Sequence, residues 1–435
     1  MAVSPQRRQE IIAALRRGTV PARALDAFAV GLEWLTPTLL DELDQVASGQ
    51  AAFKAVRGDY GCGKTFLARW FQDQARQRGF VTAEVQISET ETPLHRLETV
   101  YRRLMEHLAT ADQPQGALRQ VIDGWFFTLE EDVLASNPEL DEQTLLRRTE
   151  ALMESRLATV AKVAPAFTAS LRAYRRALLA GDRAMAEGLV AWLAGQPNVS
   201  ASVKRGAGLK GDVDHFGALG LLQGFLALIR DAGHPGLVMV LDEVETLQRM
   251  RSDARDKSLN ALRQLMDEID RGRFPGLYLF ITGTPAFFEG PYGVQRLAPL
   301  AQRLQVDFSA DTRFDNPRAV QVRLQPFDLP RLEAVGARVR GLFALGSEAE
   351  ARIHQHVDDA YLADLATAVA GRLGGKAGLA PRIFLRKLVA DVLDRVEQYP
   401  DFDPREHYAP TVAARDLTDS ERQALTDVDD VRLDL

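Results

Sequence analysis

Apolar residues along the chain form two kinds of pattern: short continuous runs, and longer stretches with helical spacing. The short runs occupy residues 51–58, 81–88, 237–243, 277–284 and 319–327. A near-continuous run such as LVMVL is typical of a parallel strand that is buried on both faces. Since helical patterns separate these runs, the sequence predicts an α/β fold with a five-stranded parallel sheet covered by helices on both faces.

Helical spacing predominates in the rest of the chain. Residues 4–46 predict helices on either side of a break at Gly18 to Pro21. Between the second and third strands the pattern is helical almost throughout, and no crossover connection needs that length. We therefore expect a helical insertion at about residues 103–215. The chain divides into a helical N-terminal segment (1–46), a core with the insertion (47–330) and a helical C-terminal region with an acidic tail (331–435).

Composition narrows the class of protein. Hydrophobic residues make up 46% and charged residues 26%, as in ordinary globular proteins. The formal net charge of -7 supplies no overall attraction to nucleic acid, although it is compatible with a local basic patch. The single cysteine, Cys62, excludes an intrachain disulfide and fits a reducing compartment. Because no apolar run is long enough to span a bilayer, we expect a cytoplasmic protein without a membrane partner.

The first strand leads into GDYGCGKT, which has the spacing of a phosphate-binding loop. Glycines let successive backbone N–H groups turn toward phosphate oxygens, and the N-terminal end of the next helix favours the same anion. Lys64 is expected to reach the β- and γ-phosphates, and the Thr65 hydroxyl is expected to bind Mg²⁺. The residues expected to bind the nucleotide are Gly58, Asp59, Tyr60, Gly61, Cys62, Gly63, Lys64, Thr65 and Phe66.

The third strand ends in two carboxylates, Asp242 and Glu243. Ligands of open α/β sheets lie at the carboxyl ends of the strands, so this pair is placed for chemistry on a bound nucleotide. Asp242 is expected to hold the Mg²⁺ shell, and Glu243 to act as the general base on the attacking water. The sequence thus predicts hydrolysis of the bound nucleotide.

Five further residues are candidates for assisting the reaction. At the end of the fourth strand, Thr284 is the first choice and Thr282 the second for orienting water or sensing the γ-phosphate, although either is also an ordinary strand-end residue. Arg303, with Arg296 as its competitor, precedes the last strand, where an arginine can reach a neighbouring subunit's nucleotide. Arg382 follows a proline at the start of a helix and is a candidate γ-phosphate contact. For each of the three arginines, a solvated surface position remains the alternative.

In this order the motifs resemble the additional-strand P-loop ATPases of the AAA+ type, in the branch that contains origin-recognition initiators and transposition ATPases. The resemblance covers residues 28–90 and 236–390 and implies sheet order 5-1-4-3-2 and a small helical lid. The run from Leu15 to Phe71, with LFITGTPAFFEG and PRIFLRKLV, more specifically resembles the ATP-binding proteins of BREX phage-defence loci, the BrxC/BrxD family. This implies ATP binding in bacterial antiviral defence, beside a helicase or DNA-modification partner.

Two basic stretches are candidate DNA contacts, although a flexible linker and a solvated helix face explain them equally simply. The first is a glycine-rich segment, expected to be a mobile loop, with Lys204, Arg205 and Lys210. The second is a helix face with Arg172, Arg175, Arg176 and Arg183. Two functions remain open: a DNA-associated, oligomeric ATPase with Arg303 acting in trans, and a slow nucleotide-controlled interaction switch. A P-loop kinase or transferase is a weaker third alternative.

Overall fold

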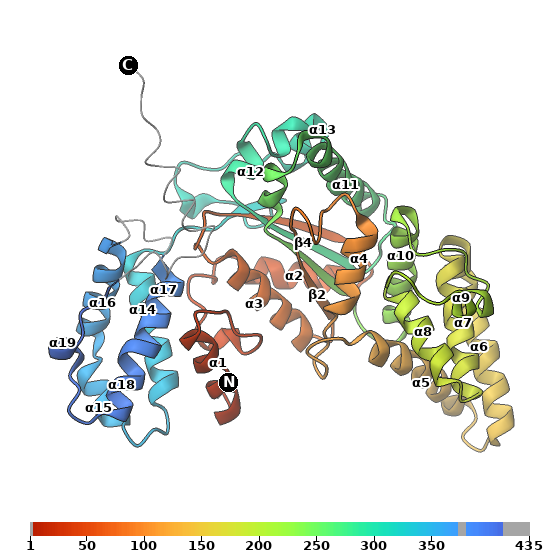
Figure 1. The fold of residues 1–435 in the computed structure, drawn as a ribbon, viewed down its shortest axis with the longest axis horizontal. Helices are drawn as coiled ribbons and strands as arrows, with labels where there is room; N and C mark the ends of the chain where they lie inside the picture. The colour runs from red at the N-terminus through yellow and green to blue at the C-terminus, as the bar shows by residue number, and fades with distance from the viewer. Residues whose placement is uncertain (1–2, 373–379, 412–435) are drawn as a thin grey trace.

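The computed structural model of the chain describes residues 3–372 and 380–411. A five-stranded, fully parallel sheet lies at its centre, in the order β2-β3-β4-β1-β5 (Figure 1). The strands are β1 (Ala52–Arg57), β2 (Val81–Gln86), β3 (Leu237–Asp242), β4 (Leu277–Gly283) and β5 (Gln321–Arg323). This confirms the predicted parallel sheet, and the order is the one that the resemblance implies, counted from the opposite edge.

The predicted strands match the observed ones closely except at the last. Only Gln321–Arg323 of the expected 319–327 pairs with β1. Pro326 lies in the part that does not pair, and proline has no N–H to donate to a ladder. The longer predicted strand was therefore wrong, and β5 is a short edge strand.

Helices cover both faces of the sheet, and the alternation along β3 shows how. Leu237, Met239 and Leu241 pack into a core with α4, α10 and α11, whereas Val238 and Val240 pack into a second core with α2 and α3. The helices around the sheet are α2 (Thr36–Ala47), α3 (Lys64–Gln77), α4 (Leu97–Glu106), α10 (His215–Asp231), α11 (Ser252–Asp270), α12 (Pro285–Glu289) and α13 (Ala298–Leu304).

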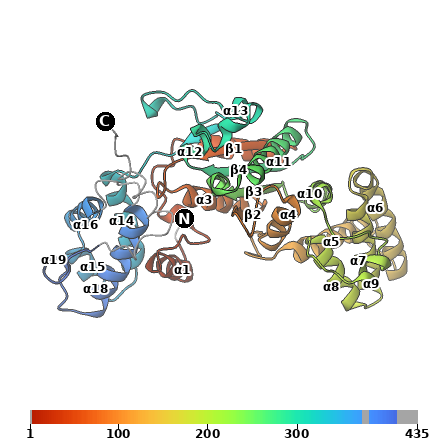
Figure 2. The same ribbon diagram turned by 45° about the horizontal axis from the view of Figure 1, so that its top comes forward.

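The helical insertion forms a lobe beside the β2 edge of the sheet, on the right in Figure 1 and again in Figure 2. Its helices are α5 (Leu118–Ser136), α6 (Glu142–Val163), α7 (Pro165–Leu179), α8 (Arg183–Leu193) and α9 (Ala201–Gly206). Trp125 on α5 donates a hydrogen bond to Asp231 at the end of α10, 2.7 Å away, and so ties the lobe to the core. The expected helix face with Arg172 and Arg183 requires one continuous helix, but Gly181, with φ +70°, separates α7 from α8.

A second helical group lies on the other side of the sheet, beside α3 (Figure 1). It comprises α14 (Leu329–Ala344), α15 (Glu350–His356), α16 (Asp359–Arg372), α17 (Ala380–Arg386), the π-helical turn Lys387–Leu393, α18 (Asp394–Gln398) and α19 (Pro404–His407). We call these helices the lid. The predicted acidic tail lies outside the described residues.

The N-terminal segment bridges the lid and the core. Helix α1 (Pro5–Arg16) is held to the lid by Arg16, whose guanidinium donates to both carboxylate oxygens of Asp394 at 2.6 and 2.7 Å. Asp26 accepts hydrogen bonds from Trp70 and Gln74 on α3 at 2.5 and 2.6 Å. The second predicted helix begins only at Thr36, because the chain first runs as turns along α3. Among the described residues, no helix has the length and apolar character needed to cross a membrane.

Candidate nucleotide-binding site

The GDYGCGKT loop connects β1 to α3 at the carboxyl edge of the sheet, and its glycines are required by its shape. Gly61 and Gly63 have φ of +78° and +96°, a region that side chains with a Cβ rarely occupy. A Cβ added at Gly58 would lie 2.3 Å from the Sγ of Cys62, which is not a possible contact. Burial raises the pKa of the Cys62 thiol, so this cysteine is a packing residue of the loop.

The loop directs Lys64 and Thr65 to the first turn of α3. Lys64 Nζ donates hydrogen bonds to the carbonyl oxygens of Gly58 and Asp59 at 2.7 and 3.1 Å, and the Tyr60 ring lies 5.2 Å from it. The lysine is buried, so its charge acts where little water screens it. The ammonium group thus lies against the loop whose backbone N–H groups would bind a phosphate chain.

Asp242 and Thr65 bring two hard oxygen ligands together. Thr65 Oγ1 donates to Asp242 Oδ2 at 2.9 Å, and the Thr282 hydroxyl donates to Asp242 Oδ1. Burial raises the pKa of the Asp242 carboxyl, and the two hydroxyl donors oppose this by favouring the ionised form. Mg²⁺ is commonly held by one or two carboxylates, a hydroxyl and substrate phosphates, so this pair fits it.

Glu243 follows β3 in a left-handed backbone conformation, with φ 59° and ψ 44°. Its backbone N–H donates to Thr282 Oγ1 at 3.2 Å and to Asp242 Oδ1 at 3.1 Å, and these bonds support the unusual conformation. The side-chain Oε2 accepts a hydrogen bond from Gln86 at 2.8 Å. Thr282, the second choice from the sequence, is therefore the threonine that contacts both carboxylate-bearing residues.

A third carboxylate, Glu245, lies in the same site and was not predicted. It is 4% exposed and its Oε1 is 3.9 Å from Lys64 Nζ. Burial is the largest cause that raises its pKa, to about 7. The segment LDEVE carried a signal for it, because a charged residue two positions beyond the Asp–Glu pair, directly after a buried strand, remains near the edge of the sheet.

The loop and the two glutamates that follow β3 border a pocket of about 610 Å³ between the loop, the N-terminal segment and the lid. The N-terminal segment supplies Phe28, Val30 and Trp34, and these apolar residues were not predicted. Their signal in the sequence is the apolar run FAVGLEW just before α2. The lid contributes Arg382 from α17, as the sequence suggested for a nucleotide contact. The pocket therefore has a polar phosphate end and an apolar end.

Three predicted residues lie elsewhere. Thr284 is buried at the start of α12 and does not line the pocket. Arg303 on α13 forms ion pairs with Asp267 and Asp270 of α11, both at 2.6 Å. Arg296 pairs with Asp256, also on α11, at 2.8 Å. The role of either arginine toward a neighbouring subunit stays a prediction.

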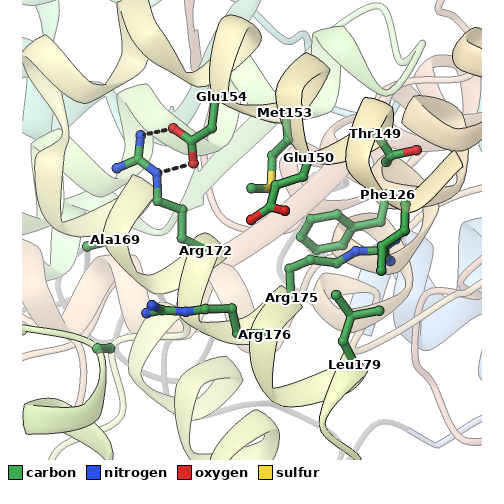
Figure 3. Close-up of a pocket in the computed structure, with 12 residues that line it drawn as sticks. Phe126, Thr149, Glu150, Met153, Glu154, Ala169, Arg172, Arg175, Arg176 and Leu179 are labelled. Atoms are coloured by element: carbon green, nitrogen blue, oxygen red, sulfur yellow. Dashed lines mark hydrogen bonds and ion pairs between the residues drawn. The ribbon is translucent and has the colours of Figure 1, made fainter. Parts of the chain in front are cut away.

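The candidate DNA contacts in the insertion are partly engaged within the chain. Figure 3 shows Arg172 joined to Glu154, with both hydrogen bonds at 2.6 Å, and Arg175 against the Phe126 ring at 5.2 Å. Arg175 also pairs with Glu130, whereas Arg176 makes no ion pair with any residue of the described chain. All three border a small pocket of about 250 Å³ between α6 and α7.

Two expectations about these basic stretches were wrong. Lys204 and Arg205 lie in the last turn of α9 and not in a loop, and Lys204 pairs with Asp212 at 3.0 Å. Arg183 begins α8 and so does not share a face with the arginines of α7, because the turn at Gly181 intervenes. Within the part of the chain that the structure describes, the candidates without an ion pair are Arg176, Arg183, Arg205 and Lys210.

Comparison with known proteins agrees with this geometry. None of the curated proteins matches the chain significantly. Residues 3–412, by contrast, match the family described as BREX system ATP-binding protein BrxC/D, and the match includes the N-terminal segment, the loop, the insertion and the lid. Because it extends over most of the chain, the protein belongs to the BREX system ATP-binding protein BrxC/D family.

Proposed function

We propose that this protein is an AAA+ type ATPase that binds ATP with Mg²⁺ and hydrolyses it to ADP and phosphate in antiphage defence. The observation that carries the proposal is the convergence of Lys64, Thr65, Asp242 and Glu243 at one edge of the sheet, with Thr65 and Asp242 oxygens 2.9 Å apart. The family name supports ATP binding and the role in defence. Sheet order and the helical lid support the AAA+ assignment.

Each residue has a defined task in this reaction. Backbone N–H groups of the loop and Lys64 bind the phosphate chain, and Thr65 and Asp242 would hold Mg²⁺, which would neutralise the developing phosphate charge. The Glu243 carboxylate accepts a proton from the water that attacks the γ-phosphorus, and the bond to the β-phosphate oxygen breaks. Arg382 of the lid contacts the γ-phosphate, so hydrolysis changes how the lid is held.

Assembly and DNA association complete the proposal. Arg303 is proposed to act on a neighbouring subunit's nucleotide in a homo-oligomer, with Arg296 as the alternative. Asp270 is 65% exposed, and an exposed ion pair contributes about 0–1 kcal/mol, so the bond from Arg303 to Asp270 can be exchanged at little cost. Arg176, Arg205 and Lys210 remain candidates for phosphate-backbone contacts, and a helicase-type defence protein is the proposed partner in the cytoplasm.

The test is steady-state ATP hydrolysis by the purified chain, with and without double-stranded DNA, at low and moderate salt. We expect turnover that DNA stimulates, with the stimulation decreasing as salt rises. Lys64→Ala should abolish ATP binding, and Glu243→Gln should retain binding and lose turnover. The ATPase proposal is wrong if Lys64→Ala binds ATP as tightly as the parent chain.

A nucleotide-controlled interaction switch is the second candidate. The bond from Gln86 to Glu243 favours it, because a general base held by another side chain is less free to activate water. Under this alternative, ATP binds tightly, turnover is slow, and DNA does not change the rate. The insertion is then the surface that reads the nucleotide state.

A further inference from the structure

Glu245 is a buried carboxyl group with unusual surroundings. Neither Oε1 nor Oε2 has a hydrogen-bond partner, although the side chain lines the proposed nucleotide pocket. Leaving a buried polar group unpaired costs about 1–3 kcal/mol, and more for a charged one. A ligand that enters the pocket can supply the missing partner.

The charges around Glu245 come from three elements. On the loop side, Lys64 favours the ionised carboxylate, but at 3.9 Å it is beyond hydrogen-bond distance. From the end of β3, Asp242 and Glu243 disfavour it. Tyr60 lies close enough to Glu245 for the carboxylate to raise the pKa of the tyrosine. Arg249, which is on the same helical turn as Glu245, also lies beside Tyr60. Burial, together with the carboxylates of Asp242 and Glu243, outweighs the effect of Lys64, so the neutral acid is readily formed near pH 7.

A bound phosphate chain would shift this balance further. Any phosphate oxygen that Lys64 holds brings negative charge close to Glu245, since the lysine and the carboxyl group are only 3.9 Å apart. An ionised carboxylate would repel that oxygen, whereas a neutral carboxyl group has an O–H to donate. The neutral form therefore satisfies both the carboxyl group and the phosphate.

We propose that Glu245 binds the nucleotide's phosphate chain as a neutral acid, donating its O–H to an oxygen that Lys64 also holds. This inference rests on the proposed ATP site. The proton comes from solvent as the nucleotide binds and returns when it leaves, and no covalent bond changes. Nucleotide affinity is thereby coupled to pH.

Isothermal titration of Mg-ATP into the full chain tests the coupling, at pH 7, 8 and 9 and in buffers with different ionisation enthalpies. The unaltered chain should take up nearly one proton per ATP at pH 8 and 9, and its Kd should rise about tenfold per pH unit. Glu245→Gln keeps a hydrogen-bond donor that does not titrate, so its Kd should lose this dependence. ATP itself also titrates, and the proton uptake measured with Glu245→Gln gives that contribution, which is then subtracted from the uptake by the unaltered chain.

Two more variants complete the design. Glu245→Ala lacks the donor and should bind about tenfold more weakly than Glu245→Gln at every pH. Glu89→Gln makes the same change at an exposed carboxyl in the turn after β2 and should behave as the unaltered chain.

The outcomes separate this inference from the proposed function. Equal proton uptake and equal pH slopes for the unaltered chain and Glu245→Gln overturn the role of Glu245 while leaving the ATP site intact. Unaltered affinity in Glu245→Ala overturns it as well. If the unaltered chain binds no ATP, both the inference and the proposed function fail.

Discussion

Gln86, the last residue of β2, donates a hydrogen bond from Nε2 to Oε2 of Glu243, at 2.8 Å. The parallel register pairs Gln86 with Asp242, so the amide lies beside the residue that follows. The bond holds the proposed general base against the β2 edge. A nucleotide-dependent change in this contact would switch hydrolysis on or off without altering the phosphate loop.

Replacing Gln86 with Ala should release Glu243 and raise ATP turnover by about twofold to tenfold, with little change in ATP affinity. The measurement is kcat beside a binding titration. Gln248→Ala is the matched control, because that glutamine follows β3 closely but donates instead to the carbonyl oxygen of Ala286 at 3.0 Å. A drop in turnover would mean that Gln86 positions Glu243 for catalysis instead of restraining it.

The two threonines of β4 and its end can be separated experimentally. Thr282→Val removes the hydroxyl that contacts Asp242 and the backbone of Glu243, so we expect turnover to fall about tenfold or more and unfolding free energy to fall by about 1–3 kcal/mol. Thr284→Val makes the same change two residues later, at the start of α12, and should leave turnover largely intact. A larger loss of turnover in Thr284→Val would restore Thr284 as the residue that senses the γ-phosphate.

Gly58 and Cys62 should show strong coupling. Gly58→Ala places a Cβ 2.3 Å from the Cys62 sulfur, so the loop must distort and ATP affinity should fall at least tenfold. Cys62→Ala alone should have little effect. In the double variant the sulfur is gone and the next contact, Leu324 Cβ, is at 3.4 Å, so most of the affinity should return. Additive losses in this cycle would show that Gly58 is needed for some reason other than space.

The sequence predicted the parts of the site that depend on local pattern. The loop, the Asp242–Glu243 pair and the parallel strands follow from spacing and continuous apolar runs, because both reflect local backbone geometry. Contacts such as Gln86 with Glu243 depend on strand order and register, which bring together residues 157 positions apart. The apolar end of the pocket was missed for a similar reason, since the N-terminal segment reaches it only by packing along α3.

The pattern of arginines illustrates the same limit. Spacing placed Arg172, Arg175 and Arg183 on one face, but Gly181 ends that helix and the acidic partners come from α5 and α6. A charge pattern on one helix does not show which charges a neighbouring helix neutralises. The arginines that stay unpaired on a helix face could therefore be identified only from the structure.

The stability of the nucleotide-free chain should also report on Glu245. Its pKa is raised from 4.5 to about 7 in the folded chain, so the folded state binds this proton more tightly than the unfolded state. Stability from the neutral group is complete below pH 4.5 and is lost as pH rises through about 7. The full loss is on the order of 3 kcal/mol.

Glu245→Gln cannot lose a proton, so its stability relative to the parent should increase between pH 5 and 8 and then level off. Urea unfolding at several pH values, without nucleotide, measures this difference, and Glu89→Gln should show no comparable change. A difference that stays constant across this range would mean that Lys64 keeps Glu245 ionised in the folded chain. In that case the carboxylate would be a fixed counter-charge for Lys64, which ATP would have to displace, and its removal should tighten ATP binding at every pH.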